Sequence, residues 1–211
     1  MQKQASFQDV AIVSCGTLLP ELSHLKKSGF LDAKKILYTT PGRHENPREL
    51  QQRLINKISI AKKYSEKIIV VYGGKFCYVN TDDPYQTIDT IIEKQGPGIC
   101  RIQASHCIDM LATQKEREKI ANGKKVWWMT PGWLISQKFV FQDWDKGKAV
   151  ENFPKHTGGA IVLDGIDFFD HYVAEHPEEL LEFSDWMGIP IESYKISLDR
   201  FKNLLLAQIH V

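Results

Sequence analysis

The chain has little of what marks membrane proteins and nucleic-acid-binding proteins. Its longest apolar runs, residues 68–72 and 204–207, are far shorter than the roughly 20 residues that span a bilayer as a helix. Its 27 basic and 26 acidic side chains give a net charge of +1, without a cluster of one sign. Because nucleic acid and anionic lipid bind clustered Lys and Arg, we expect neither a nucleic-acid nor a membrane partner.

Cysteines are few, and no secretory signal is evident. The N-terminal segment is polar and lacks the apolar stretch of a signal peptide, so we expect a cytoplasmic protein. In that reducing compartment the 4 cysteines are expected to be thiols, metal ligands or redox groups, and not structural disulfides.

Several common enzyme motifs are also missing. No Gly-x-Gly-x-x-Gly follows a predicted strand, and no Gly-x-Ser-x-Gly occurs, so nothing supports a dinucleotide fold or a serine hydrolase. Gly73-Gly74-Lys75 follows a predicted strand but lacks the spacing of a P-loop. We interpret it as a tight turn near a ligand.

Short β-branched runs alternate with helical patterns at a spacing of roughly thirty residues, which is the size of a βαβ unit. The predicted strands are residues 9–14, 34–40, 67–72, 98–103, 125–129, 159–163 and 191–195. Predicted helices lie near residues 18–27, 47–64, 84–94 and 197–208, with others after His106 and Thr130 and a break at Pro177. This pattern predicts an α/β fold: a doubly wound, mostly parallel sheet of about six or seven strands with helices on both faces, a Rossmann-like three-layer arrangement. We expect one domain, residues 1–211.

Three cysteines follow strand ends. Cys15 comes after the first predicted strand, Cys77 after the third and Cys107 after the fourth, whereas Cys100 lies inside a strand. Ligands of open α/β sheets bind beyond the carboxyl ends of the strands. Since thiolates bind zinc, copper(I) and iron–sulfur iron, we predict a metal site made by Cys15, Cys77 and Cys107. The alternative is three thiols without a metal.

Other polar side chains share the same predicted edge. We assign His106 and Asp164 as catalytic candidates, and Asp164 could instead cap the following helix. His106 and His44 are also candidate metal ligands, with capping or substrate contact as the alternative for His106. Lys75, His44 and Trp133 are the candidates for binding a substrate, although His44 could be an ordinary exposed histidine and Trp133 a core residue.

The loops together resemble a known family. Ser14-Cys15-Gly16 with Glu21-Leu22, Tyr72-Gly73 leading to Cys77, His106-Cys107-Ile108-Asp109 and Thr130-Pro131-Gly132-Trp133 are similar to family 1638 of the domains of unknown function, which is bacterial and archaeal. The resemblance covers residues 10–192. In the family pattern the second loop is Tyr-Gly-x-Cys and the third is His-Asp-Cys-Ile. Here Cys77 comes later, and Ser105 stands where the pattern has histidine.

The resemblance implies a context of anaerobic one-carbon and corrinoid methyltransferase metabolism. Our leading hypothesis is a metalloenzyme or accessory factor with a small-molecule substrate or a corrinoid protein as partner. Its cofactor would be a metal ion, first zinc, then iron or an iron–sulfur cluster, or a corrinoid. One rival is metal-free catalysis with Cys107 or Cys15 as the nucleophile, and the other is a non-catalytic cofactor carrier or interaction module. A homo-oligomer is compatible with the sequence.

Overall fold

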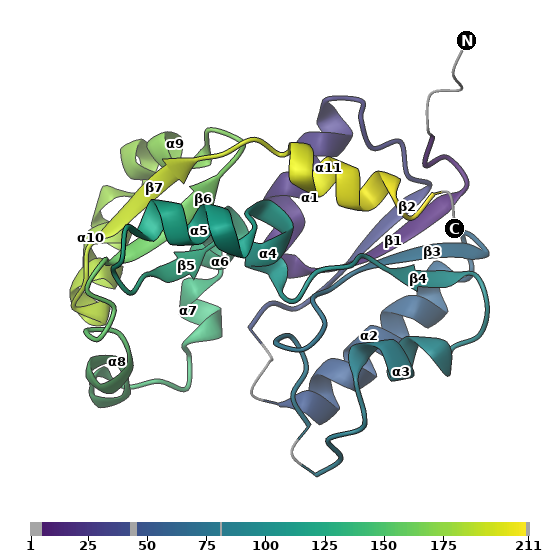
Figure 1. Ribbon diagram of the computed structural model, residues 1–211, viewed down its shortest axis with the longest axis horizontal. Coiled ribbons are helices and arrows are strands. Elements are labelled where there is room, and N and C mark those ends of the chain that lie inside the picture. The colour runs from purple at the N-terminus through teal and green to yellow at the C-terminus, as the bar shows by residue number, and fades with distance from the viewer. Residues whose placement is uncertain (1–5, 43–45, 81, 210–211) are drawn as a thin grey trace.

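All strands in the described part of the chain are parallel. The computed structural model describes residues 6–42, 46–80 and 82–209. A four-stranded sheet has the order β2-β1-β3-β4 and a three-stranded sheet the order β5-β6-β7 (Figure 1). The strands are β1 Val10–Cys15, β2 Lys35–Thr39, β3 Lys67–Val71, β4 Ile99–Arg101, β5 Trp127–Met129, β6 Ala160–Asp164 and β7 Ile191–Lys195.

Helices connect these strands. They are α1 Leu19–Lys27, α2 Pro47–Ala61, α3 Ile88–Glu93, α4 Cys107–Leu111, α5 Gln114–Ala121, α6 Pro131–Ile135, α7 Gln137–Val140, α8 Lys146–Asn152, α9 Phe168–Glu175, α10 Pro177–Met187 and α11 Asp199–Leu206. A short 3-10 helix, Gly16–Leu18, leads from β1 into α1. Within residues 6–42, 46–80 and 82–209, no helix has the length and apolar character to cross a membrane.

The predicted parallel α/β class is confirmed, and each predicted strand is found within a few residues of its expected place. The seven strands are nevertheless divided between two sheets, because β5 pairs with β6 and not with β4. Sequence periodicity reports which face of a strand is apolar, whereas strand pairing depends on where α4 and α5 carry the chain after β4. The predicted helix starts at Pro47 and after Thr130 and the predicted break at Pro177 are confirmed, since Pro47, Pro131 and Pro177 each begin a helix.

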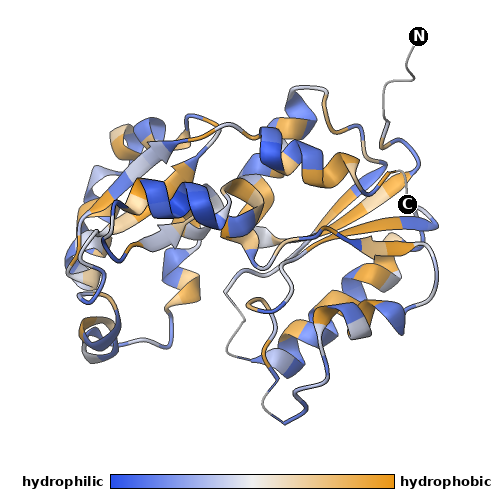
Figure 2. Ribbon diagram, viewed as in Figure 1, coloured by the Kyte–Doolittle hydropathy of each residue, from blue (hydrophilic) through white to orange (hydrophobic). Residues whose placement is uncertain are grey.

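The first sheet is the middle of three layers. Alternate residues of β1 point to opposite faces, as the two-residue repeat of a strand requires. Val10 and Ile12 pack with α1, α4 and α11 on one face. Val13 and Cys15 pack with α2 and α3 on the other, and Figure 1 shows these two helices together below the sheet. β1 and β3 are largely orange in Figure 2, and nearly all of their residues are buried, so a continuous apolar run specifies a central strand here.

One helix is rich in charge and lies at the surface, with Ile120 as its contact to the core. The charge-rich stretch that begins near Lys115 forms α5, which has no buried residue and is the bluest helix in Figure 2. Thr113 caps it with a reciprocal pair of bonds to Glu116. The alternating charges of this helix therefore lie on a solvated face.

The two sheets meet at the carboxyl end of β1. The Thr130 hydroxyl, which caps α6, also donates to the Thr17 carbonyl oxygen at 2.7 Å. A Cβ at Gly132 would lie 2.5 Å from the same oxygen, so only glycine lets α6 approach this closely. The loop that follows Cys15 therefore forms part of the junction between the sheets.

Candidate functional site

Three thiols lie around the carboxyl edge of the first sheet, as predicted. Cys15 is the last residue of β1, Cys77 lies in the loop after β3, and Cys107 is the first residue of α4, after β4. Cys15 and Cys77 are buried and Cys107 is half-buried. None of the four cysteines, all of which the structure describes, forms a disulfide.

The three thiols lie close enough to interact electrostatically. Burial is the main cause that raises the pKa of Cys77 to about 12, and the charge of Cys15 adds to it. Burial likewise raises the pKa of Cys107 well above its usual value, and the charges of Cys77 and Cys15 raise it further. The pKa of Cys15 is raised by burial as well. All three groups are therefore neutral thiols at neutral pH unless a cation compensates them.

Hydrogen-bond donors surround the sulfur atoms. The Thr17 hydroxyl donates to the Cys15 sulfur at 3.2 Å, and the Tyr72 hydroxyl and the Thr17 amide lower the pKa of the Cys15 thiol. The amides of Gly73 and Cys107 act in the same way on Cys77. Thr17 and the amide of Ile108 do so on Cys107. Each of these donors stabilises a thiolate more than a thiol, so the environment opposes the effect of burial.

A close approach of two loops brings Cys77 and Cys107 together. A Cβ at Gly73 would lie 2.3 Å from the Cα of His106 and 2.5 Å from the sulfur of Cys77. Both distances are far below van der Waals contact. Glycine at position 73 is therefore required so that the loop after β3 can pack against the loop after β4.

A buried arginine fixes the same loops. Arg101 is 8% exposed. Its guanidinium donates to the carbonyl oxygens of Tyr72, Ile102 and Ala104 at 3.2, 2.8 and 3.1 Å and pairs with Asp89 on α3 at 2.7 Å. Its positive charge also lowers the pKa of Cys77. Arg101 thus supplies both a scaffold and a compensating charge beside the thiols.

The sulfur atoms do not yet converge on one point. Within the described ranges, no group of three or more His, Cys, Asp and Glu side chains is arranged to hold a metal ion. Cys15 and Cys77 belong to the core layer under α2 and α3, whereas Cys107 packs against the opposite layer. The thiols therefore approach one another from two faces of the sheet.

His106 has the capping role that the sequence left as its alternative. Its Nδ1 accepts from the amide of Asp109 at 3.1 Å, so in the neutral ring Nε2 carries the proton. Burial lowers the pKa of His106, and the charge of Arg117 lowers it further. In this tautomer Nδ1 accepts a hydrogen bond and Nε2 carries a proton, so neither nitrogen has a lone pair available for a metal. Its ring lies 5.7 Å from that of Phe76, and a catalytic role for His106 stays a prediction.

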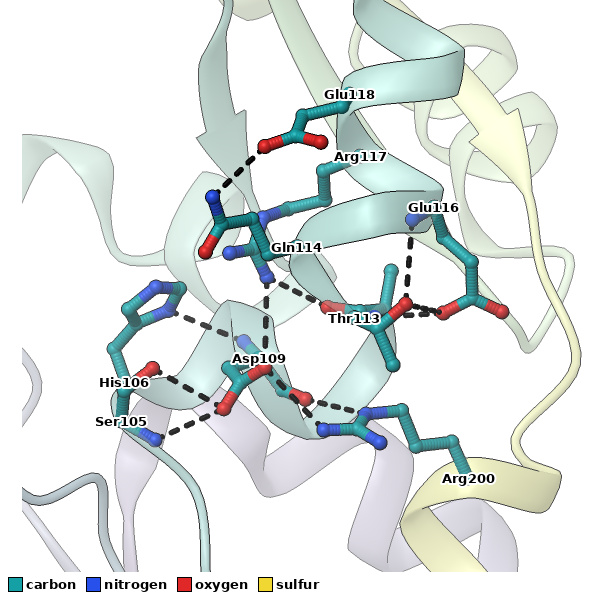
Figure 3. A network of polar contacts seen from close by, with 10 residues as sticks. Ser105, His106, Asp109, Thr113, Gln114, Glu116, Arg117, Glu118 and Arg200 are labelled. Atoms are coloured by element: carbon teal, nitrogen blue, oxygen red, sulfur yellow. Dashed lines mark hydrogen bonds and ion pairs between the residues drawn. The ribbon is translucent and has the colours of Figure 1, made fainter.

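Asp109 ties the Cys107 helix to the C-terminal helix (Figure 3). Its carboxylate accepts from the amide and hydroxyl of Ser105 at 3.0 and 3.1 Å. Arg200 on α11 donates to the Asp109 carbonyl at 2.6 Å and pairs with its carboxylate at 3.3 Å, and Arg117 lies at 3.8 Å. These contacts hold the start of α4, and with it Cys107, in place.

The substitution Asp109→Asn is expected to lower the free energy of unfolding by about 1–3 kcal/mol, because an amide leaves Arg200 and Arg117 without their anion. Urea denaturation at neutral pH measures this loss. Asp185→Asn, at an exposed position on α10, is the control and should unfold like the wild type. Equal stability of Asp109→Asn and wild type would show that the network contributes nothing.

Of the other predicted residues, Asp164 caps a helix and Lys75 lies at the surface. Asp164 is 3% exposed, and its carboxylate accepts from the amides of Ile166, Phe168 and Phe169 at 3.0, 3.1 and 2.8 Å, so it caps the start of α9. Its catalytic role stays a prediction. Lys75 is exposed beside Phe76 and lines an open cavity of ≈ 450 Å³ that also includes Asp89.

Trp133 packs into the aromatic core of the second sheet, with its ring 5.0 Å from Phe141 and 6.0 Å from Trp127. The core position that the sequence left as its alternative is therefore the one it occupies. His44 lies outside the described residues, so its assignment stays a prediction.

A buried carboxyl stands out near this junction. Glu21 on α1 is fully buried, and both of its carboxyl oxygens lack a hydrogen-bond partner within the part of the chain that the structure describes. Burial raises its pKa to about 8, and the charge of Asp164 at the end of β6 contributes. Glu21 is therefore mostly protonated at neutral pH.

Thr17, Tyr72, Arg101 and Glu21 were not among the predicted site residues. Two of them carried a usable signal: Arg101 is a charge inside an apolar strand, and Glu21 interrupts the apolar face formed by Leu18, Leu22 and Leu25. Charged residues are rarely buried unless they are paired or functional. Tyr72 stands in the family pattern of the second loop, whereas Thr17 carried no signal, because its role depends on distances between loops.

The comparison with known proteins confirms the resemblance. Residues 38–205 match the model of the family described as "protein of unknown function (DUF1638)". Cys77 and Cys107 lie inside the matched segment and Cys15 precedes it. No curated protein and no solved structure matches the chain.

Proposed function

Because this chain belongs to the DUF1638 family, whose description assigns no activity, we propose its function from the thiols: Cys15, Cys77 and Cys107 bind a soft metal ion as thiolates. The observation that carries the proposal is the mutual proximity of three thiols, from the end of β1, the loop after β3 and the start of α4, each supplied with N–H or O–H donors. Nothing else in the described core requires three thiols beside one another.

The chemistry of these groups fits a metal better than it fits free thiols. Metal binding displaces the thiol protons, and hydrogen bonds from neighbouring donors tune thiolate ligands. The Thr17 hydroxyl donates to the Cys15 sulfur and also lies within hydrogen-bonding reach of Cys107. Arg101 adds positive charge that offsets part of the charge of three thiolates.

Binding requires the sulfurs to converge. Tetrahedral zinc holds sulfur at about 2.3 Å, so the thiolates must come within about 4 Å of one another. Rotation about χ1 moves each sulfur between staggered positions without moving the backbone. The proposal therefore requires rotamer changes of these cysteines that bring their sulfur atoms together.

Three protein ligands leave one coordination position for a small molecule, and a metal there acts as a Lewis acid or activates a thiol or water. Zinc is the ion we propose first, and iron, an iron–sulfur cluster or a corrinoid are the other occupants. A metalloenzyme or accessory factor of corrinoid-linked methyl metabolism in the cytoplasm, acting on a small molecule or a corrinoid protein, is the most specific form of the proposal.

The metal-free rival is disfavoured by burial. A nucleophilic cysteine needs a depressed thiol pKa and access to substrate. Here burial raises the pKa of Cys15 and Cys107, and Cys15 is 5% exposed. His106, the nearest candidate base in sequence, uses its Nδ1 as a helix cap.

Elemental analysis and an absorption spectrum of protein purified without oxygen test the proposal. We expect about one equivalent of zinc or another soft metal. Cys15→Ala, Cys77→Ala and Cys107→Ala should each lose most of it, because a site of three ligands does not survive on two. Cys100→Ala is the matched control, since Cys100 lies within β4, and it should retain the metal.

Two results would end the proposal. One is a protein that neither contains metal nor binds added zinc under reducing conditions. The other is a metal content unchanged by all three alanine variants. Alkylation of the metal-free protein tests the rival. If Cys15 or Cys107 reacts far faster than the other cysteines, the result supports a nucleophilic cysteine instead of a metal ligand.

A further inference from the structure

An aromatic groove lies on the second sheet's helices, apart from the three cysteines. It is a cavity of ≈ 280 Å³ lined by Phe141, Trp144, Phe183 and Trp186, with Lys138, Glu179 and Glu182 among the polar residues. This volume is at the small end of the range of about 300–1,000 Å³ for small-molecule sites. The groove runs between α7, the segment that follows it, and α10.

The rings form a floor and walls. Phe141 and Phe183 are 9% and 4% exposed and make the floor. Trp144 and Trp186 are half-buried and present part of their rings to the groove. Phe141 lies 5.0 Å from Trp144 and 5.1 Å from Trp186, and Phe183 stacks on Trp186 at 5.9 Å. The rings therefore brace one another, so the groove does not depend on a ligand for its shape.

One amine and two carboxylates line the groove beside the rings. Lys138 pairs with Glu179 at 3.0 Å, and Tyr172 also donates to Glu179 at 3.3 Å. Glu182 is exposed, and no ion pair is found for it among the described residues. Glu182 is therefore the carboxylate of the lining that is available to a cation, beside aromatic faces that are themselves electron-rich. Lys148, over the Trp144 ring, and Lys146, at the Trp186 carbonyl, lie outside the lining.

We propose that this groove binds the quaternary or fully N-methylated ammonium group of a small molecule. Aromatic faces attract cations, and cages of aromatic rings recognise quaternary ammonium ligands. Such a group has methyl carbons for the aromatic walls and no N–H that must find an acceptor when buried. Trp144 already accepts an ammonium group from within the chain, because Lys148 Nζ lies 4.4 Å from its ring centroid. Glu182 supplies the counter-charge.

Titration of the full chain with choline, followed by calorimetry and tryptophan fluorescence, tests the proposal. The control ligand is the carbon isostere of choline, in which a tert-butyl group replaces trimethylammonium. A cation–π site should bind choline about tenfold more tightly than the isostere. An apolar groove without cation recognition would bind both equally, and that result, or an absence of saturable choline binding, would overturn the proposal.

Variants locate the site. Trp186→Leu should abolish choline binding and Trp186→Phe should retain most of it, while Glu182→Gln should weaken it several-fold. Glu178→Gln, at an exposed position on the same helix but outside the groove, should leave the affinity unchanged. If Trp186→Leu fails to fold, the choline affinity of Glu182→Gln and the comparison of choline with its carbon isostere test the proposal. Choline binding that is unaffected by both Glu182→Gln and Trp186→Leu would place the site elsewhere and refute the assignment.

Discussion

Glu21→Gln is expected to abolish a loss of stability that the wild type shows between about pH 5 and about pH 8. Burial raises the pKa of Glu21 from 4.5 to about 8 in the folded protein. Within that interval the folded state holds one proton more than the unfolded state, so raising the pH favours unfolding. At about 1.4 kcal/mol for each pKa unit, the wild type should lose about 4 kcal/mol over this range.

The direction follows from the protonated form. A group whose pKa is raised on folding contributes its full stabilisation below its unfolded pKa and loses it as the pH rises through the folded pKa. Glutamine has nearly the same shape as a protonated glutamate and does not ionise. The variant should therefore be more stable than the wild type above about pH 8.

Urea denaturation at a series of pH values measures the effect, and the difference between wild type and variant removes the contributions of histidines and thiols common to both. Glu182→Gln, at an exposed position, is the control for the same chemical substitution outside the core. Parallel pH curves for Glu21→Gln and wild type would mean that Glu21 is solvated or paired in the folded protein.

Gly73→Ala is expected to cost more than about 3 kcal/mol of stability and to remove bound metal. Overpacking a core typically costs about 1–3 kcal/mol when side chains can adjust. Here the added carbon meets the Cα and amide nitrogen of His106 at 2.3 and 2.8 Å, and backbone atoms cannot rotate away. The loop after β4 must then move, and Cys107 moves with it.

The adjacent glycine is the matched control. A Cβ at Gly74 would meet only the guanidinium of Arg101, with its nearest atom at 3.2 Å. A side-chain end can shift by a few tenths of an ångström, so Gly74→Ala should cost much less than Gly73→Ala. Thermal or urea unfolding of both variants, together with their zinc content, makes the comparison. If both variants resemble the wild type, the loops do not approach as closely as the structure has them.

Glu21 and the thiols occupy neighbouring parts of one junction. Thr17, between Cys15 and α1, bonds to α6 of the second sheet, and Glu21 follows one turn into α1 and senses Asp164 of β6. The same short segment therefore carries a thiol, a hydroxyl within reach of two thiols, and a buried acid. A change at this junction is expected to alter both sheet packing and the thiol site.

The sequence by itself determined the local elements. The apolar run of β3 predicts a strand buried on both faces, and the prolines at positions 47, 131 and 177 mark helix starts because proline fits the first turn and disrupts later ones. It also placed three cysteines at strand ends, because the carboxyl ends of parallel strands share one edge.

Only the tertiary structure decided the rest. Contacts between distant segments decide which strands pair. The local sequence therefore does not show that the first sheet ends at β4 and that β5 begins a second sheet. His106 and Asp164 have the residue types of both a catalyst and a cap, and the amides that reach them settle which bonds they make. The same holds for Gly73, whose necessity comes from a loop more than thirty residues away. Distances between loops are properties of the packed chain, because each depends on every element that packs between them.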